Sequence, residues 1–366
     1  MRKSAPHSIP AAALLKPLLW LGLIALATAC STAPTPGNEP IAVVDDSSGY
    51  RRMGNTWLAQ GGESLILLAF SGGGTRAAAL SYGVLEELRD TLLTNGSGAG
   101  VQLLDEVDNI SSVSGGSFTA AYYGLFGKQI FEDFEDVFLR YDVQGALVRQ
   151  VLNPAQWARS SFSGFDRTES AVDYYDRKIF RGATFDDMRA DGPFIEINAT
   201  DLGTGLRFSF TQERFDMLCT DLGDFPVARA VTASSAVPVV FPTVVLKNYA
   251  DQCDPGESKA WQVLTADRDI ARTEAHSELI EGLFSYRDVE ARPYIHLVDG
   301  GVADNLGLRA MTDRFETFNE QGLSMLRKNP PSNVLIILVN AQVKRKRMLE
   351  QTAKKPSAST TMSAYT

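Results

Sequence analysis

Seven short apolar runs punctuate the chain and predict buried strands. They are Leu65–Phe70, Asp108–Val113, Phe194–Ala199, Leu206–Phe210, Val239–Leu246, Tyr294–Val298 and Val334–Val339. Segments between several of them have the apolar spacing of helices, as at Leu80, Val84, Leu85 and Leu88. Strands that alternate with helices favour a mainly parallel sheet that is covered on both faces. The pattern therefore predicts an α/β fold with a mainly parallel central sheet and helices on both faces, in three layers.

The segments between the predicted strands carry further structural signals. Asp201–Gly205 is expected to join two strands as a hairpin. Phe126–Asp187, rich in aromatic residues and paired charges, is expected to form helical cap material. Its aromatic residues would either line an acyl-chain pocket or, by default, pack in the core. Asp251–Asp288 is charged and punctuated, which predicts a long excursion on the surface.

Three of the strand ends carry small residues that are typical of active-site turns. The first strand runs into Gly72-Gly73-Gly74 and then into a helical pattern. Such a turn gathers backbone N–H groups that bind an anion, either a phosphate or a developing oxyanion. A phosphate loop would end in Gly-Lys-Ser/Thr, which is absent, and a dinucleotide fingerprint would need glycine where Ala77 stands. An unliganded strand-to-helix turn is the alternative.

The second turn, within Asp108–Ala120, has the layout of a nucleophile elbow. An apolar run leads to Ser114, and an Ala/Tyr/Phe-rich helix follows it. The usual pattern is G-x-S-x-G, and here Ser112 and Gly116 occupy the two glycine positions. Ser111, Ser112 and Ser117 are alternative nucleophiles, but only Ser114 stands at the middle of the turn. An ordinary turn before a helix is the other interpretation.

The third turn places a carboxylate at the end of a strand. Asp299 is followed by Gly300-Gly301, which lets the backbone bend sharply and leaves the carboxylate accessible. The alternative is a routine Asp-Gly turn, with Asp304 or Asn305 capping the next helix.

These three motifs, in this order, resemble the patatin-like phospholipase family, whose members use a Ser–Asp dyad without histidine. The resemblance runs from about Leu65 to Gly307, and it includes Ala233–Pro242, which is similar to the family's small-residue helix ending in Pro and Phe. Ala77 and Ser112 replace two glycines of the family pattern. The resemblance implies a patatin-like, three-layer α/β/α fold. It also implies roles for particular residues, namely Ser114 as nucleophile, Asp299 as its base-like partner, Gly72, Gly73 and Gly74 as the oxyanion loop, and Arg76 as a head-group contact or a structural residue.

The histidines test this interpretation, because a Ser-His-Asp triad needs one. The chain has three, and His7 lies in the N-terminal leader. His276 stands in a charged stretch that is expected to be a solvated loop. His296 lies on the strand before Asp299, where alternation points the two side chains to opposite faces. A conventional triad is therefore disfavoured, with His276 as its remaining candidate.

The expected activity is hydrolysis of phospholipid or lysophospholipid esters by a membrane-associated serine hydrolase. In the dyad, Asp299 takes the Ser114 proton, and the glycine loop holds the oxyanion. The alternatives are a non-catalytic, lipid-binding envelope lipoprotein and a small-ester carboxylesterase.

The N-terminus predicts export and a membrane tether. Residues 1–29 combine a basic start, an apolar run and small residues, which is typical of a signal peptide. Cys30 follows directly and resembles the lipid-attachment cysteine of bacterial lipoproteins, which implies a periplasm-facing location, with Ser31 favouring the outer membrane. Plain secretion with cleavage near Ala29 is the alternative. Residues 30–60 are expected to be a flexible linker, 61–345 the hydrolase domain and 346–366 a polar tail.

Charge and cysteines add little further chemistry. The net charge of −9 argues against nucleic-acid binding. The basic run Lys344–Arg347 is expected to be a solvated face, with contact to anionic lipid as the alternative. We expect no metal or cofactor, because no Cys/His cluster or calcium-loop spacing is present. Cys219 and Cys253 favour a disulfide over two free thiols in an oxidising compartment.

Overall fold

The computed structural model describes residues 37–51, 64–94, 100–141, 167–236, 243–254, 256, 258–268, 273–317 and 333–343. His7, Cys30, Pro238–Pro242 and Lys344–Arg347 lie outside these residues. The strands are β1 (Ser64–Phe70), β2 (Leu92–Thr94), β3 (Gly100–Gln102), β4 (Val107–Val113), β5 (Phe194–Asp201), β6 (Leu206–Ser209), β7 (Val244–Lys247), β8 (Tyr294–Val298) and β9 (Asn333–Val339).

Helices surround these strands. The α-helices are α2 (Gly74–Asp90), α3 (Gly115–Phe126), α4 (Ile130–Phe134), α7 (Arg167–Tyr175), α8 (Gln212–Asp216), α9 (Val227–Ser234), α10 (Lys259–Arg268), α11 (Glu274–Phe284), α12 (Gly301–Asp304) and α13 (Arg309–Thr317). Short 3₁₀ turns are η1 (Leu103–Glu106), η2 (Gly127–Gln129), η5 (Phe185–Asp187) and η7 (Ser285–Arg287), and η3 (Glu135–Leu139) and η4 (Asp176–Phe180) are π-helical.

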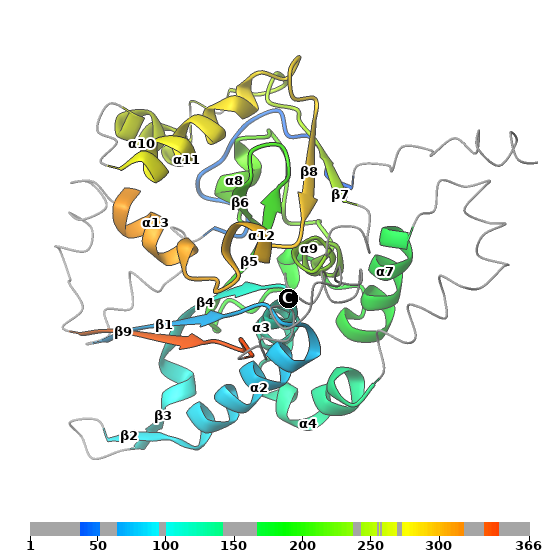
Figure 1. Cartoon of the computed structure of the whole chain (residues 1–366), viewed down its shortest axis with the longest axis vertical. Helices are drawn as coiled ribbons and strands as arrows, with labels where there is room; N and C mark the ends of the chain where they lie inside the picture. The colour runs from blue at the N-terminus through cyan, green and yellow to red at the C-terminus, as the bar shows by residue number, and fades with distance from the viewer. Residues whose placement is uncertain are drawn as a thin grey trace, which may run out of the picture.

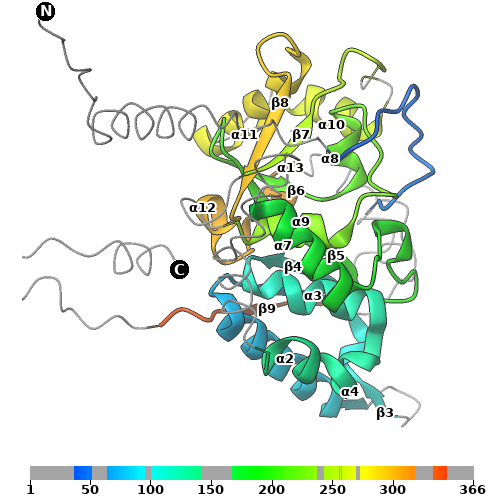
Figure 2. The same ribbon diagram turned by 90° about the vertical axis from the view of Figure 1, so that its right-hand side faces the viewer.

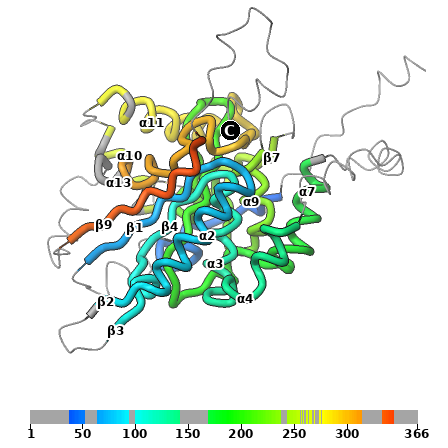
Figure 3. Tube along the Cα trace, turned by 60° about the horizontal axis from the view of Figure 1, so that its bottom comes forward, coloured from blue at the N-terminus to red at the C-terminus, as the bar shows by residue number. Residues whose placement is uncertain are grey.

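The central sheet is mixed, with parallel strands at its centre. Its order is β7-β8-β5-β4-β1-β9, and β6 also pairs with β5. The β9–β1, β1–β4 and β4–β5 pairs are parallel, and β9, β1 and β4 run side by side in Figure 3. The β5–β6, β5–β8 and β7–β8 pairs are antiparallel. The predicted α/β class with a mainly parallel centre is therefore confirmed, and so is the hairpin at Asp201–Gly205.

The two faces of β1 pack against different layers of helices. Ile66, Leu68 and Phe70 belong to the main core, which includes the buried face of α2. Leu65 and Leu67 point the other way and pack with Met311 of α13. In Figure 1, α2 and α3 lie on one side of β1 and β4, and α13 lies on the other. Burial on both faces explains why the run is continuously apolar and not alternating.

One edge of β5 receives two different strands. β6 pairs with residues 198–201 of β5, whereas β4 pairs with residues 194–198, so these two overlapping partners occupy opposite edges. β8 pairs antiparallel with Thr200 and Asp201 of β5. β6 pairs with the same two residues from the other edge of β5. β8 therefore shares the edge of β4. The two strands run toward each other, and their C-terminal ends meet beside Ala199 (Figure 1).

Two segments differ from the sequence-based expectations. Asp251–Asp288, expected as a surface excursion, contains α10 and α11, and Trp261 and Ile280 in these helices are buried. That expectation was wrong because the dense charges mask the apolar positions that each helix turns inward. The described helices of Phe126–Asp187 follow the default expectation instead, since Phe138 is buried and stacks on Phe118 of α3.

Part of the expected linker packs on the folded body. Residues 37–51 lie beside α8, where the buried Arg51 guanidinium binds the Asp216 carboxylate at 2.5 Å (Figure 2). The Asn38 side chain donates to the Lys247 carbonyl of β7 at 2.8 Å and accepts its N–H at 2.9 Å. A single amide side chain thus continues the pairing of an edge strand. The body therefore begins by Gly37, before the expected boundary at residue 61.

A disulfide secures the same region. Cys219, just after α8, is bonded to Cys253, after β7, with an S–S distance of 1.97 Å. The Cys219 carbonyl also accepts the N–H of Ile41 at 2.8 Å. The bridge therefore joins the loop that holds residues 37–51 to the chain after β7. Within the described residues, no helix has both the length and the apolar character needed to cross a bilayer.

Candidate active site

The turn after β4 is a strained elbow centred on Ser114. Its backbone has φ 51° and ψ −120°, a conformation that non-glycine residues seldom adopt. A Cβ on Gly115 would lie 2.0 Å from the Gly74 carbonyl oxygen, and one on Gly116 would lie 2.8 Å from that of Ser71. Both positions therefore require glycine. Ser112, which replaces the first glycine of the usual pattern, is accommodated because its hydroxyl donates to the Glu196 carbonyl at 3.2 Å.

Asp299 stands at the end of β8 and faces this elbow. The Ser114 hydroxyl donates to Asp299 Oδ2 at 2.8 Å, and the Gly301 N–H donates to Asp299 Oδ1 at 2.7 Å. Gly300 packs so closely that an added Cβ would lie 2.3 Å from the Asn198 carbonyl oxygen. The head-to-head approach of β4 and β8 thus becomes a direct contact between the two turns.

Burial changes the acidity of the Asp299 carboxyl. Asp299 is 8% exposed and Ser114 is 7% exposed. Loss of hydration raises the pKa of Asp299 to about 6, although the hydrogen bonds from Gly301 and Ser114 act in the opposite direction. The carboxylate is therefore a stronger base than an ordinary aspartate and is ionised at neutral pH.

The glycine-rich turn supplies fewer free donors than the sequence suggests. The Gly72 N–H donates to the Asn305 carbonyl at 2.9 Å, so it is already engaged. Among the described residues, no hydrogen bond engages the N–H groups of Gly73 and Gly74. Both residues have positive φ, 138° and 63°, and Gly74 begins α2 beside the elbow. Two N–H groups are thus left for an anion near Ser114.

One protein-family model matches the part of the chain that contains the whole candidate site. A model described as patatin-like phospholipase matches residues 68–312, about two thirds of the chain. The chain belongs to the patatin-like phospholipase family. A search of curated proteins found no match. The matched range contains the three turns of the site and begins inside β1.

Arg76 of this patatin-like domain has a structural contact. Its Nε donates to the Ala341 carbonyl at 3.1 Å, just beyond β9, and its side chain lies in the first turn of α2. The guanidinium therefore ties the glycine turn to the edge of the sheet. This contact agrees with the structural alternative for Arg76.

Neither described histidine contacts the dyad. His276 was expected in a solvated loop, which is wrong, because it lies in α11 and is 5% exposed. His296 is exposed on β8, and its Nδ1 lies 3.1 Å from the Thr243 hydroxyl. The Asp299 carboxylate accepts hydrogen bonds from the Ser114 hydroxyl and the Gly301 N–H. Alternation along the strand had indicated the outward direction of His296.

The other serines of the elbow are engaged elsewhere. Ser111 donates to the Gly307 carbonyl at 2.6 Å, and the Ser117 hydroxyl lies 3.0 Å from that of Ser234. Only Ser114 contacts Asp299. Asp304, in turn, accepts the Arg309 N–H at 2.7 Å and so caps α13, as its alternative interpretation held.

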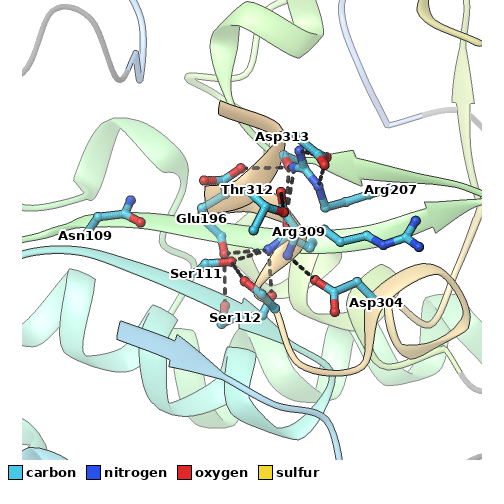
Figure 4. A network of polar contacts seen from close by, with 12 residues as sticks. Asn109, Ser111, Ser112, Glu196, Arg207, Asp304, Arg309, Thr312 and Asp313 are labelled. Atoms are coloured by element: carbon cyan, nitrogen blue, oxygen red, sulfur yellow. Dashed lines mark hydrogen bonds and ion pairs between the residues drawn. The ribbon is translucent and has the colours of Figure 1, made fainter. Parts of the chain in front are cut away.

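A buried polar network supports the strand that leads into the elbow (Figure 4). The Arg207 guanidinium of β6 binds Glu196 of β5 at 3.2 Å and Asp313 of α13 at 2.9 Å. Asn198 donates to the Ser111 hydroxyl at 3.0 Å and to the Ser112 carbonyl at 3.1 Å. The sequence alone did not single out Glu196, Asn198, Arg207 or Asp313. The available signal was the alternation of Glu196, Asn198 and Thr200 in an otherwise apolar strand.

Gly300→Ala is predicted to destabilise the fold, because the new methyl would press on backbone that cannot yield. An overpacked position of this kind costs roughly 1–3 kcal/mol of unfolding free energy. Gly83→Ala is the matched control, since a Cβ there meets nothing within 4 Å on α2 and alanine favours a helix by about 0.5–1 kcal/mol. Chemical denaturation of both variants measures the difference. Equal stability of the two variants would contradict the close packing of the Asp299-Gly300-Gly301 turn against β5.

Proposed function

We propose that this protein hydrolyses the carboxylic esters of phospholipids or lysophospholipids through a Ser114–Asp299 dyad. The observation that carries the proposal is the 2.8 Å hydrogen bond from the Ser114 hydroxyl to the Asp299 carboxylate at a strained elbow. Membership of the patatin-like phospholipase family supports lipid-ester hydrolysis as the reaction class.

The chemistry follows from the groups that surround Ser114. As the Ser114 oxygen attacks the ester carbonyl, its proton passes to Asp299 Oδ2, along the existing hydrogen bond. The carbonyl oxygen becomes an oxyanion, and the N–H groups of Gly73 and Gly74, which no described residue engages, donate to it. Asp299 then returns the proton to the leaving alcohol, and an acyl-Ser114 ester remains. Water, deprotonated by Asp299, releases the fatty acid and restores Ser114.

The electrostatics of the site suit a dyad. A serine hydroxyl is a weak acid, and an ordinary carboxylate is a poor base for it. Burial raises the pKa of Asp299 toward neutrality and so reduces the difference between the pKa values of the serine hydroxyl and the carboxyl group. Asp299 also needs no third residue to orient it, since the Gly301 N–H fixes the other oxygen. The Gly301 contact thus replaces the orienting group of a triad.

Loss of either dyad residue is predicted to abolish turnover. In the full-length protein, Ser114→Ala and Asp299→Asn should each lower kcat by at least about a thousandfold, because each removes a reacting group. Asp136→Asn, at an exposed carboxylate on η3, is the matched control. Fatty-acid release is measured from phosphatidylcholine, lysophosphatidylcholine and p-nitrophenyl butyrate, with thermal unfolding as the check on folding.

The three substrates separate the competing functions. Faster release from the phospholipid or lysophospholipid supports the proposal, whereas turnover of p-nitrophenyl butyrate alone indicates a small-ester carboxylesterase. Wild type and Ser114→Ala that are equally inert on all three substrates would favour a non-catalytic lipid-binding protein.

Activity is predicted to fall in acid as Asp299 gains a proton. Only the carboxylate accepts the Ser114 proton, so kcat/KM should be level above pH 7 and drop about tenfold per unit below pH 6. The midpoint lies near 6 and not near 4, because burial favours the protonated form. A profile of kcat/KM from pH 4 to 8 tests this. A midpoint at or below pH 4 would contradict a buried Asp299 as the base.

We also propose that Cys30 carries a lipid that tethers the protein to the periplasmic face of the outer membrane. Because the body begins by Gly37, the intervening chain reaches at most about 25 Å. The folded body would thus stay close to the membrane surface. In a Gram-negative host, wild type and Thr32→Ala should incorporate radiolabelled palmitate and sediment with outer membranes, and Cys30→Ala should do neither. Equal palmitate incorporation by Cys30→Ala would overturn the tether.

A further inference from the structure

The hydrogen-bond ladder between β4 and β5 stops one rung before the elbow. Val113 of β4 is the register partner of Asn198 of β5. In a regular parallel ladder, the N–H of the next residue, Ser114, would donate to the Asn198 carbonyl. The Ser114 N–H instead donates to the hydroxyl of Ser234 at 2.9 Å, and that hydroxyl donates to the Asn198 carbonyl at 2.6 Å. A side chain from α9 therefore occupies the place of a backbone hydrogen bond.

The Ser234 hydroxyl has all of its hydrogen-bonding capacity in use. It has one proton, which goes to Asn198, so it accepts from both Ser114 N–H and the Ser117 hydroxyl, the latter at 3.0 Å. Ser234 and Ser117 are both fully buried. No water is needed to satisfy these groups, and the inserted hydroxyl has one defined orientation.

The same end of α9 also holds the aspartate turn. The Ser234 carbonyl accepts the Gly300 N–H at 3.0 Å, and the Ala236 carbonyl accepts the Asp299 N–H at 2.9 Å. Ser234 thus binds the serine elbow through its side chain and the aspartate turn through its backbone. Ser234 belongs to neither turn but forms hydrogen bonds with both.

We infer that Ser234 is a positioning residue, whose inserted hydroxyl holds Ser114 away from β5 and in line with Asp299. This inference rests on the proposed hydrolysis and deepens it. Without the hydroxyl, the buried Ser114 N–H and Asn198 carbonyl either stay unpaired, which is costly, or approach each other to complete the ladder. Completion of the ladder would draw Ser114 back toward β5 and lengthen its hydrogen bond to Asp299.

The neighbouring Ser235 provides a matched control on the same helix. Its hydroxyl donates to the Val231 carbonyl at 2.8 Å, within α9, and it contacts neither turn through its side chain. Ser235→Ala therefore removes the same atoms from an adjacent position. Any general cost of deleting a hydroxyl from the end of α9 should appear in both variants.

The test compares wild type, Ser234→Ala, Ser235→Ala and Ser234→Thr as full-length proteins, with p-nitrophenyl butyrate as the probe. Ser234→Ala is expected to lower kcat by roughly ten- to a hundredfold while KM changes by less than about twofold, because the reacting geometry and not ester binding is altered. Ser235→Ala should stay within about twofold of wild type. Ser234→Thr, which keeps a hydroxyl, should recover most of the lost kcat.

The pH profile adds a readout that a purely structural role would not move. The hydrogen bond from Ser114 lowers the pKa of Asp299, so its weakening in Ser234→Ala should shift the acid limb of kcat to higher pH. A kcat for Ser234→Ala within twofold of wild type, or an unshifted acid limb, would overturn the inference. If Ser234→Ala does not fold, Ser234→Thr decides. A folded threonine variant whose kcat is roughly ten- to a hundredfold below that of wild type would also overturn the inference.

These outcomes are distinct from a failure of the proposed function. If wild type and Ser114→Ala hydrolyse the probe equally, the dyad itself fails and with it any role of Ser234. If wild type is active, Ser114→Ala is inactive and Ser234→Ala matches wild type, only the positioning role fails.

Discussion

The buried hydrogen bond between Ser114 and Asp299 is the contact on which the rest of the site depends. It joins turns that are 185 residues apart in the chain, so it exists only if β4 and β8 end at the same place. The sheet achieves this by placing both strands on one edge of β5, pointing at each other beside Ala199. β6 occupies the opposite edge of β5 along residues 198–201. The antiparallel strand β8 therefore brings Asp299 to an elbow that the parallel part of the sheet forms.

Close packing around the two turns sets strict demands on their residues. Gly115 and Gly300 each face a backbone carbonyl that leaves no room for a side chain, and Ser114 itself holds a strained φ of 51°. Strain of this kind persists only where the surroundings fix it. The end of α9 and the polar network around Asn198 provide that fixation from two directions. The same close packing excludes water from Asp299 and raises its pKa, so structure and reactivity have a common origin.

Much of the candidate site could be predicted from the sequence, because each turn has a local sequence pattern. A strand followed by Gly72–Gly74, by Ser114 or by Asp299-Gly300-Gly301 needs no knowledge of distant residues. Ser234 and Asn198 escaped detection, since their roles depend on a ladder rung that forms only in the assembled sheet. The engagement of the Gly72 N–H by Asn305 is likewise a tertiary contact. Charge density misled the assignment of α10 and α11, whose apolar residues are too few to stand out from their charged neighbours.

The most direct test of the account is to identify which residue reacts with a fluorophosphonate, a reagent that forms a stable adduct with an activated serine. Intact mass spectrometry and peptide mapping of the full-length protein would give the stoichiometry and the position. The account predicts one adduct per chain, located on Ser114, with labelling that slows as the pH falls through about 6. An adduct on another serine such as Ser111 or Ser117, or ester hydrolysis that continues after Ser114 is fully labelled, would contradict it.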